Sequence, residues 1–319
     1  MCLNYKIIGA FSCLFLLTGC SSGFLGLAPA GDRKEYIEAR KAYDMGDYPT
    51  AISSLSEYIY KTKNVNRREV RAYRLLGKSY EQSGQTSRAL EVYLEALEFH
   101  PKNVPLLLEA AHLYQQNGLT MRSIELYDKA LTQEPTNTTA LAGQAANYTT
   151  LGFYSKARTF YDRFFELSEK ITPDYRARYA STFLHQRNYE QAFIHITLAL
   201  EQDSSNPDFW RLSAEARRGL NQPQAALLDL EAAVQLAPQR TDFLAYKALW
   251  LYEAEQYEDS VQTADLILQL QPNNELAQLI QALNWSKQGK TKAARKQLEQ
   301  IAQQTPDSFV GQVSQKLLQ

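Results

Sequence analysis

The stretch that decides the fold is residues 71–103, which read RAYRLLGKSYEQSGQTSRALEVYLEALEFHPKN. Apolar residues in its first half, such as Tyr73, Leu76 and Tyr80, fall three and four apart, which places them on one face of a helix. Gly84 follows at a place that suits a left-handed C-cap residue. A second run of the same spacing comes next, so the stretch predicts two short antiparallel helices joined by a tight turn.

The same pattern returns about every 34 residues, and repeats of this length are typical of solenoids. A small residue marks each copy, at intervals of 38, 34, 34, 35, 34, 34 and 34: Ala51, Ala89, Ser123, Ala157, Ala192, Ala226, Ser260 and Ala294. Glycine ends the first helix of five copies: Gly46, Gly84, Gly118, Gly152 and Gly289. Proline closes five: Pro101, Pro135, Pro238, Pro272 and Pro306. We therefore expect eight units, beginning near Asp32, Val70, Val104, Thr138, Pro173, Pro207, Thr241 and Glu275.

The order of residues in 71–103, an aromatic, Leu-Gly, Tyr, Ala, Tyr, Ala and Pro, resembles the tetratricopeptide repeat (TPR) signature. The resemblance implies an all-α fold, a right-handed superhelical solenoid of about eight helix-turn-helix repeats. We expect one domain over 32–306, because a solenoid has no single core and grows by adding layers. The apolar pattern of 307–319 predicts a C-terminal capping helix, through Phe309, Val310, Val313, Leu317 and Leu318.

Some units depart from the pattern. The first lacks the Leu-Gly pair, and roughly four additional residues separate it from the second. Arg187, Asn221 and Glu255 stand where glycine is usual in the fifth, sixth and seventh units. We expect these departures to weaken individual units and to leave the array intact.

The amino-terminal segment predicts a destination in the cell envelope. Lys6 precedes an apolar run over 7–17, which is too short to span a bilayer but suits a secretory signal. The run ends in Leu-Thr-Gly-Cys20, which resembles the lipobox of bacterial lipoproteins. This implies a signal peptide over 1–19, an acylated (palmitate-bearing) Cys20 and a tether over 20–31. The alternative is a plain secretory signal with a fortuitous cysteine.

The resemblance also implies a place for the protein. Serine after the lipid-bearing cysteine, here Ser21, implies sorting to the outer membrane, so we expect a lipid-anchored protein facing the periplasm. All three cysteines, Cys2, Cys13 and Cys20, lie in the first twenty residues. A body without cysteine suits an oxidising compartment.

Neither composition nor motif points to catalysis. The formal net charge of −1 gives no support for nucleic-acid binding, which usually requires a basic face. The four histidines are scattered, HExxH, GxSxG and glycine-rich phosphate loops are lacking, and the body has no cysteine for a zinc site. We expect no enzyme, no metal and no cofactor, and interpret His100 and His195 as solvated residues.

The TPR resemblance implies a binding groove along the first helix of each unit. Positions that face away from the packed stripe give the candidates Arg33, Tyr36, Arg40, Tyr43, Arg71, Arg74, Lys78, His112, Arg211, Arg218 and Tyr252. The first seven form a basic, tyrosine-bearing stretch, and the later positions turn mixed and then apolar. We expect an envelope protein segment with an acidic or carboxylate end to dock on the basic stretch. The alternative is that these cations only solvate a helical face.

The resemblance implies a non-enzymatic protein–protein interaction scaffold. With the lipobox, it predicts an outer-membrane TPR lipoprotein that assists assembly of an envelope machine, of the pilus and secretin type or the peptidoglycan-hydrolase adaptor type. The alternative is a component of polysaccharide export or of a secretion apparatus. Glycan binding calls for a row of exposed aromatic rings, and only Tyr36, Tyr43 and Tyr252 qualify. Partner identity and oligomeric state stay open.

Overall fold

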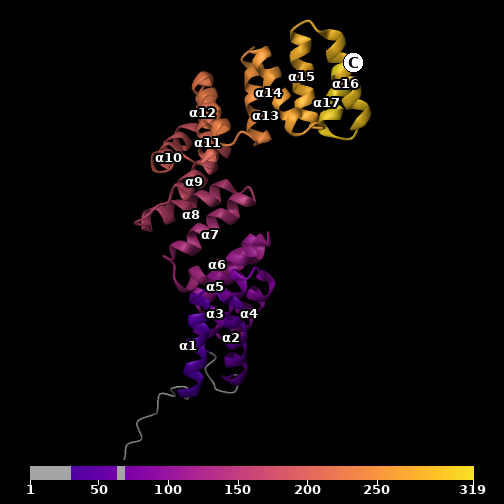
Figure 1. The fold of residues 1–319 in the computed structure, drawn as a ribbon. Helices are drawn as coiled ribbons and strands as arrows, with labels where there is room; N and C mark the ends of the chain where they lie inside the picture. The colour runs from indigo at the N-terminus through magenta and orange to yellow at the C-terminus, as the bar shows by residue number, and fades with distance from the viewer. Residues whose placement is uncertain (1–29, 63–68) are drawn as a thin grey trace, which may run out of the picture. The chain divides into compact units, whose positions relative to one another are not determined.

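The structure, a computed structural model, describes residues 30–62 and 69–319, and all regular elements within those ranges are α-helices (Figure 1). In chain order they are α1 (Ala30–Asp44), α2 (Tyr48–Thr62), α3 (Val70–Gln82), α4 (Thr86–Phe99), α5 (Val104–Gln116), α6 (Thr120–Gln133), α7 (Thr138–Thr150), α8 (Tyr154–Leu167), α9 (Pro173–His185), α10 (Tyr189–Gln202), α11 (Pro207–Gly219), α12 (Pro223–Leu236), α13 (Thr241–Glu253), α14 (Tyr257–Leu270), α15 (Glu275–Lys287), α16 (Thr291–Gln304) and α17 (Phe309–Leu318). The expected all-α fold of paired helices is confirmed. The predicted signal peptide, Cys20 and most of the predicted tether lie outside the described residues.

The helices group into two compact units, an N-terminal unit over residues 1–99 and a C-terminal unit over residues 100–319. The sequence, which we interpreted as one solenoid domain, carries no sign of this division. The interval from Ala89 to Ser123 is the same 34 residues found elsewhere, although the unit boundary falls inside it.

In the N-terminal unit, α1 packs on α2, α2 on α3 and α3 on α4, and α1 also contacts α3. The small side chain of Ala39 lets α1 approach α2 closely, and Leu55, Tyr58 and Leu76 fill the buried core between the layers. Tyr36 packs half-buried against this cluster. The apolar stripe of each helix therefore faces its partner, as the spacing of three and four residues predicts.

In the C-terminal unit, six helix pairs follow one another, and their first helices α5, α7, α9, α11, α13 and α15 start at Val104, Thr138, Pro173, Pro207, Thr241 and Glu275. Side chains of α17 cover the last pair, because Val310, Val313 and Leu318 pack against the buried Leu279 and Leu298. A solenoid needs such a cover for its exposed last layer.

Two residues of the capping pattern do not pack as expected. Phe309 is 79% exposed and Leu317 is 49% exposed. Phe309 is the first residue of α17, so it lies at one end of the helix that packs against α15 and α16. The burial of α17 therefore rests on Val310, Val313 and Leu318.

The turns between paired helices have left-handed backbone at the predicted positions. The five turn glycines have φ between 73° and 79°: Gly46, Gly84, Gly118, Gly152 and Gly289. The three substitutes adopt the same conformation, with φ of 57° at Arg187, 60° at Asn221 and 61° at Glu255. Left-handed backbone costs an L-residue about 1–2 kcal/mol, although asparagine tolerates it better. The helix-turn-helix geometry therefore imposes itself on residues that disfavour it.

Glycines inside helices serve close packing. A Cβ at Gly143 of α7 would lie 2.3 Å from the ring of Tyr127 of α6, and a Cβ at Gly77 would lie 2.2 Å from the ring of Tyr93. Both tyrosines are almost fully buried. The missing side chain therefore makes room for the ring that fills the interhelical space.

His195 differs from its interpretation as a solvated residue. Its ring is half-buried on α10, with its centroid 4.5 Å from that of Tyr179 and 5.6 Å from that of Phe183, with which it stacks. Burial lowers the pKa of His195, and the nearby positive charge of Arg176 lowers it further. The ring packs as an aromatic side chain, which a pattern of helical positions does not reveal. His100 is also half-buried.

Candidate functional site

Successive first helices of the C-terminal unit approach one another, because α7 contacts both α5 and α9, α9 contacts α11, and α13 contacts α15. Side chains at equivalent positions of these helices, away from the packed stripe, make a surface that we call the first-helix face. Its members, exposed or half-buried, are Leu108, His112, Gln115, Ala146, Thr149, Asp174, Ser181, Asp208, Arg211, Glu215, Arg218, Asp242, Ala245, Leu249, Tyr252 and Leu283. Two further positions expected there, Ala142 and Leu279, are buried.

In the N-terminal unit, the candidates on α1 are engaged with neighbours. Arg40 is exposed and pairs with Asp44 at 3.1 Å one helical turn away, and this contact raises the pKa of Arg40. The Tyr36 ring lies 6.0 Å from that of Tyr58, and the Tyr43 ring lies 5.7 Å from that of Tyr48. The side chain of Arg33 lies outside the described residues. The expected basic, aromatic surface of α1 is thus partly neutralised and partly packed.

Three cations lie along one side of α3, and we call them the α3 basic stripe: Arg71, Arg74 and Lys78. Arg71 is exposed, whereas Arg74 and Lys78 are half-buried and interact with other residues. Their spacing of three and four residues puts them on adjacent turns. The stripe presents positive charge along about two turns of helix.

The first-helix face is neutral at α5 and α7. His112 is exposed, and its Nε2 lies 2.9 Å from the side-chain amide of Gln116. Gln115 donates from its amide to the Gly143 carbonyl at 3.2 Å and to the Asn147 side chain at 2.8 Å, which ties α5 to α7. The chemistry offered here is that of amide and imidazole hydrogen bonding.

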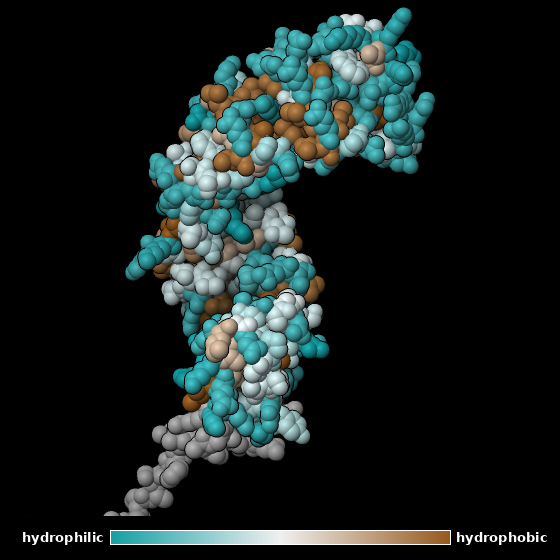
Figure 2. All heavy atoms as spheres, in the orientation of Figure 1, coloured by the Kyte–Doolittle hydropathy of each residue, from teal (hydrophilic) through white to brown (hydrophobic). Residues whose placement is uncertain are grey.

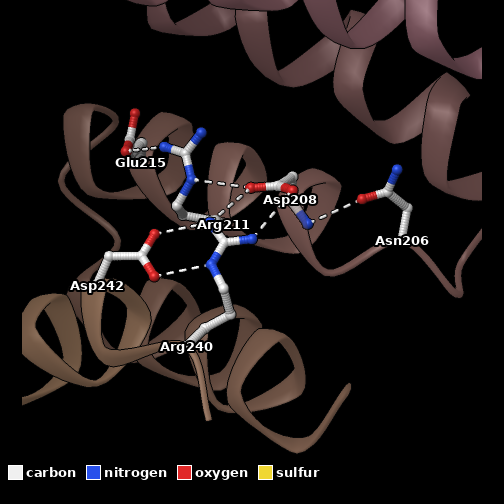
Figure 3. A network of polar contacts seen from close by, with 6 residues as sticks. All are labelled: Asn206, Asp208, Arg211, Glu215, Arg240 and Asp242. Atoms are coloured by element: carbon white, nitrogen blue, oxygen red, sulfur yellow. Dashed lines mark hydrogen bonds and ion pairs between the residues drawn. The ribbon is translucent and has the colours of Figure 1, made fainter. Parts of the chain in front are cut away.

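The face is strongly charged at α11 and the start of α13, where a network joins two arginines and three carboxylates (Figure 3). Arg211 lies between Glu215, which it contacts closely, and Asp208, at 3.8 Å. Arg240, in the turn before α13, contacts Asp242 at 2.7 Å and Asp208 at 3.3 Å. The network bridges two consecutive repeats.

The network neutralises Arg211, which the sequence predicts to be a cationic binding residue. Hydrogen bonding from Arg240 lowers the pKa of Asp242, and the two carboxylates raise the pKa of Arg240 in turn. The carboxylates of the network outnumber its guanidinium groups by one. Arg211 is a partner of these acids.

A second bridge crosses from α11 to α13 close by. Arg218 forms an ion pair with Glu253, and its guanidinium carbon lies 4.9 Å from the centre of the Trp250 ring. These residues line a pocket of about 280 Å³ together with Pro223, Gln224, Ala226, Leu227, Ala254 and Gln256. Two successive repeats are thus joined by ion pairs near both ends of α11.

Sequence reasoning missed Arg240 and Asp242 as members of the face. A signal existed, because Asp208 and Asp242 are 34 residues apart and so occupy the same position in successive repeats. Two carboxylates one layer apart on the same face attract a cation between them. Arg240 lies in a turn, which the search of helical positions did not include.

The tyrosine candidates do not form an open stacking row. The Tyr252 ring lies 5.8 Å from that of Tyr257. The rings of Tyr36 and Tyr43 likewise each lie beside another tyrosine ring. All three are half-buried. On the side seen in Figure 2, hydrophobic residues gather around α12 to α14. Leu228 of α12 is 72% exposed and Leu266 of α14 is 48% exposed.

The described residues contain neither a metal-binding cluster nor a helix that could span a membrane. Among residues 30–62 and 69–319, no group of three or more His, Cys, Asp or Glu side chains is placed to hold a metal ion. None of the helices in the described part of the chain has the length and apolar character needed to cross a membrane.

Comparison with known proteins finds a family model that matches part of the chain. Residues 70–113 match a model of the tetratricopeptide repeat family. Two human proteins, RANBP2-like and GRIP domain-containing proteins 8 and 5/6, are each 33% identical over 92 residues. That match spans 28% of this chain and only 5% of theirs.

Solved structures extend the likeness over most of the chain. A tetratricopeptide repeat protein from Parabacteroides merdae is similar with a TM-score of 0.60 and 20% identity, over 80% of this chain and 99% of that one. A structure described as YrrB, a TPR protein with an unusual peptide-binding site, has a TM-score of 0.50 and 18% identity, over 59% of this chain and 96% of that one. Likenesses at this identity concern the fold. The chain therefore has the all-α solenoid fold of tetratricopeptide repeat proteins, and its residues 70–113 match the model of that repeat.

Proposed function

We propose that this chain is a non-enzymatic scaffold of the bacterial cell envelope, which binds a segment of a partner protein along its first helices while a lipid on Cys20 holds it at the outer membrane. The TPR fold is that of a protein–protein interaction scaffold, and YrrB is described as carrying a peptide-binding site. The observation that carries the proposal is the alignment of polar side chains on successive first helices. Such an array offers hydrogen bonds at regular intervals to an extended segment.

The α3 basic stripe is the element that would select the partner. Arginine forms bidentate, charge-assisted hydrogen bonds with carboxylates, so a segment with acidic side chains or a free carboxyl end fits the stripe. The network around Arg240 differs, because its carboxylates outnumber its cations by three to two. Carboxylate recognition is therefore assigned to the α3 basic stripe, whose three cations lie on adjacent turns of one helix, rather than to Arg211.

A charge-reversal experiment tests the stripe. The triple substitution Arg71→Glu, Arg74→Glu and Lys78→Glu should abolish capture of envelope proteins from detergent-solubilised membranes. The matched control reverses three cations of a second helix, α16, with Lys292→Glu, Arg295→Glu and Lys296→Glu, and should leave capture intact. Unchanged capture by the α3 variant, with its helical content preserved, contradicts the role of the stripe.

The lipid anchor is tested separately. Cells that express the full chain and are fed labelled palmitate should label the wild type and the Cys13→Ser control, but not Cys20→Ser. Replacing Ser21 with aspartate should move the labelled protein from the outer to the inner membrane fraction. A wild-type chain without label contradicts the lipoprotein assignment and leaves the stripe untouched.

The machine that such a scaffold would serve is an assembly of the pilus and secretin type or a peptidoglycan-hydrolase complex. Crosslinking from a photoreactive residue at position 71, compared with one at the exposed Lys292, separates these two. A secretin crosslinked only from position 71 supports the first, and a hydrolase supports the second. An export porin in that place contradicts both and favours the polysaccharide-export alternative.

A further inference from the structure

Two neighbouring turns of the C-terminal unit carry exposed apolar side chains. The turn between α5 and α6 exposes Leu119 (51%) and Met121 (62%), and the turn between α7 and α8 exposes Leu151 (36%) and Phe153 (59%). We call these four residues the turn patch. They lie at or next to the turns that contain the left-handed Gly118 and Gly152.

Two of these residues occupy places where helix stability favours another side chain. Leu119 is the N-cap of α6 and Phe153 is the N-cap of α8, and neither makes a side-chain capping bond. At the equivalent place in the next repeat, Asn188 caps α10 by accepting a hydrogen bond from the backbone of Gln191. Ser, Thr, Asn or Asp is strongly preferred over Leu at an N-cap. Gln222, Gln256 and Lys290 at the equivalent places of later repeats also make no side-chain capping bond, but these residues are polar. Leu119 and Phe153 differ from them in exposing apolar surface.

Cations surround the turn patch. The three successive turns at 116–122, 150–158 and 185–190 contain Arg122, Lys156, Arg158 and Arg187, of which Arg122 forms an ion pair with Glu125 at 3.2 Å. The equivalent turn of the seventh repeat, 252–259, contains four acids and no cation. Positive charge is therefore found at the turns beside the patch, and again at 287–292 with its three lysines, but not at every turn of the solenoid.

Side-chain contacts hold these three turns together. Ile124 of α6 packs with Tyr148 and Ala157, which ties the first turn to the second. The Tyr154 ring stacks on His185 with centroids 4.1 Å apart, which ties the second turn to the third. Gln186 also bonds to Ser155 and Arg158, each at 3.1 Å. The apolar and cationic side chains therefore keep a fixed arrangement on one edge of the unit.

We infer that this edge docks on an anionic lipid bilayer. Exposed apolar side chains on successive turns suit a soft surface, because headgroups and acyl chains move aside for them, whereas a protein partner would need a matching pocket for each. Apolar groups inserted at the interface combine with Lys and Arg at the headgroups, the pairing typical of peripheral membrane binding. Lys156 is exposed and Arg187 projects from a left-handed turn.

Docking goes beyond the proposed lipid anchor, on which it depends only for bringing a bilayer within reach. A chain tethered at Cys20 alone presents its first helices in any orientation. A second contact through the turn patch would orient the C-terminal unit at the membrane. The two ideas separate experimentally, because the chain with Cys20→Ser carries no lipid and still has the turn patch.

The test is cosedimentation of the full chain from position 20, with Cys20→Ser, with vesicles of phosphatidylglycerol and phosphatidylethanolamine. It should bind these vesicles, release at high salt because the attraction is screened, and not bind phosphatidylcholine vesicles. The variant Leu119→Asn with Phe153→Asn should lose binding at least tenfold while unfolding at the same or a higher temperature, since asparagine restores both caps. A loss of binding therefore cannot come from misfolding.

Two further variants complete the design. Lys156→Gln with Arg187→Asn should weaken binding about fivefold for each cation removed. The control Leu228→Gln with Phe309→Gln removes exposed apolar side chains elsewhere and should bind as the parent does. The inference is overturned if the parent chain does not bind the anionic vesicles, or if the asparagine variant binds equally well. It is also overturned if sedimentation velocity shows a dimer that the asparagine variant loses, because the patch then joins two copies.

Discussion

Asn284 of α15 donates a hydrogen bond from Nδ2 to the hydroxyl of Ser260 of α14 at 2.8 Å, in a fully buried position. Ser260 in turn donates to the carbonyl of Ala248 at 2.7 Å. The same relay occurs between the third and fourth repeats, where Asn147 donates to Ser123 at 2.9 Å. Ser260 and Ser123 are the two serines among the eight small residues that mark the repeats. Each is matched by an asparagine in the next repeat.

The relay predicts energetic coupling between Ser260 and Asn284. Ser260→Ala should lower the free energy of unfolding by about 1 kcal/mol, the usual worth of a hydrogen bond. Combined with Asn284→Ala, the loss should be smaller than the sum of the single losses, by about 0.5–3 kcal/mol. Urea unfolding of the four chains measures the coupling, and Ser286→Ala on the exposed side of α15 serves as the control. Additive single effects would contradict the relay.

Replacing left-handed residues with glycine should stabilise the chain. Arg187→Gly and Glu255→Gly each remove a backbone strain of about 1–2 kcal/mol. Glycine also gives the unfolded chain more conformational freedom, which offsets part of this gain, so each substitution should raise the free energy of unfolding by about 0.5–1 kcal/mol. Asn221→Gly should change little, because asparagine tolerates this conformation. The reverse control is Gly118→Ala, where no atom lies within 4 Å of the added Cβ, so its loss reports the backbone alone. Thermal unfolding ranks the four, and a loss of stability in Arg187→Gly would refute the strain.

Gly143→Ala should destabilise the chain although alanine favours helices. The added Cβ would lie 2.3 Å from the Tyr127 ring, and overpacking of a core costs about 1–3 kcal/mol, more than the gain of about 1 kcal/mol in helix propensity. In a Tyr127→Leu background the ring is gone, and the same substitution should stabilise. This reversal of sign in urea unfolding is the diagnostic result. Loss of stability in both backgrounds would assign another role to Gly143.

Alkaline pH should unfold the chain through buried tyrosines. Burial raises the pKa of Tyr127 and of Tyr161 to about 12. The unfolded value is about 10, so the unfolded state loses its protons first. The contribution of these groups is complete below about pH 10 and is lost as the pH rises toward 12. In Tyr161→Phe, the urea concentration at the midpoint of unfolding should fall less steeply between about pH 10 and pH 12 than in the wild type. An unchanged slope would contradict the burial effect.

Mild acid should act through His195. Its pKa in the fold is lowered by burial first and then by Arg176, with Asp162 opposing, so the neutral ring is favoured. Its contribution is present above the unfolded pKa of about 6.5 and is lost as the pH falls through the lower folded value. His195→Phe keeps the aromatic packing beside Phe165, Tyr179 and Phe183 and should make the chain less sensitive to acid. Equal acid sensitivity of the two chains would contradict this.

The sequence by itself determined the elements, the repeat and the turns. Helical spacing, a glycine position and a small residue depend on a few neighbouring residues, so they can be read without knowing what packs against them. The first helices after the second repeat therefore start at the residues that the repeat pattern marks. Arg187 and Glu255, which stand at the glycine position, adopt the left-handed conformation that glycine has in the other turns.

Only the tertiary structure decided what the side chains on those elements do. Asp208 and Asp242 share a repeat position, but the offset between successive layers brings Arg240 between them and turns Arg211 into part of an ion-paired network. Tertiary packing also buries His195 among aromatic rings, and it leaves Phe309 at the start of α17 exposed. Pairing between layers depends on the rotation and translation from one repeat to the next. The sum of many interhelical contacts sets those values, so no single repeat encodes them.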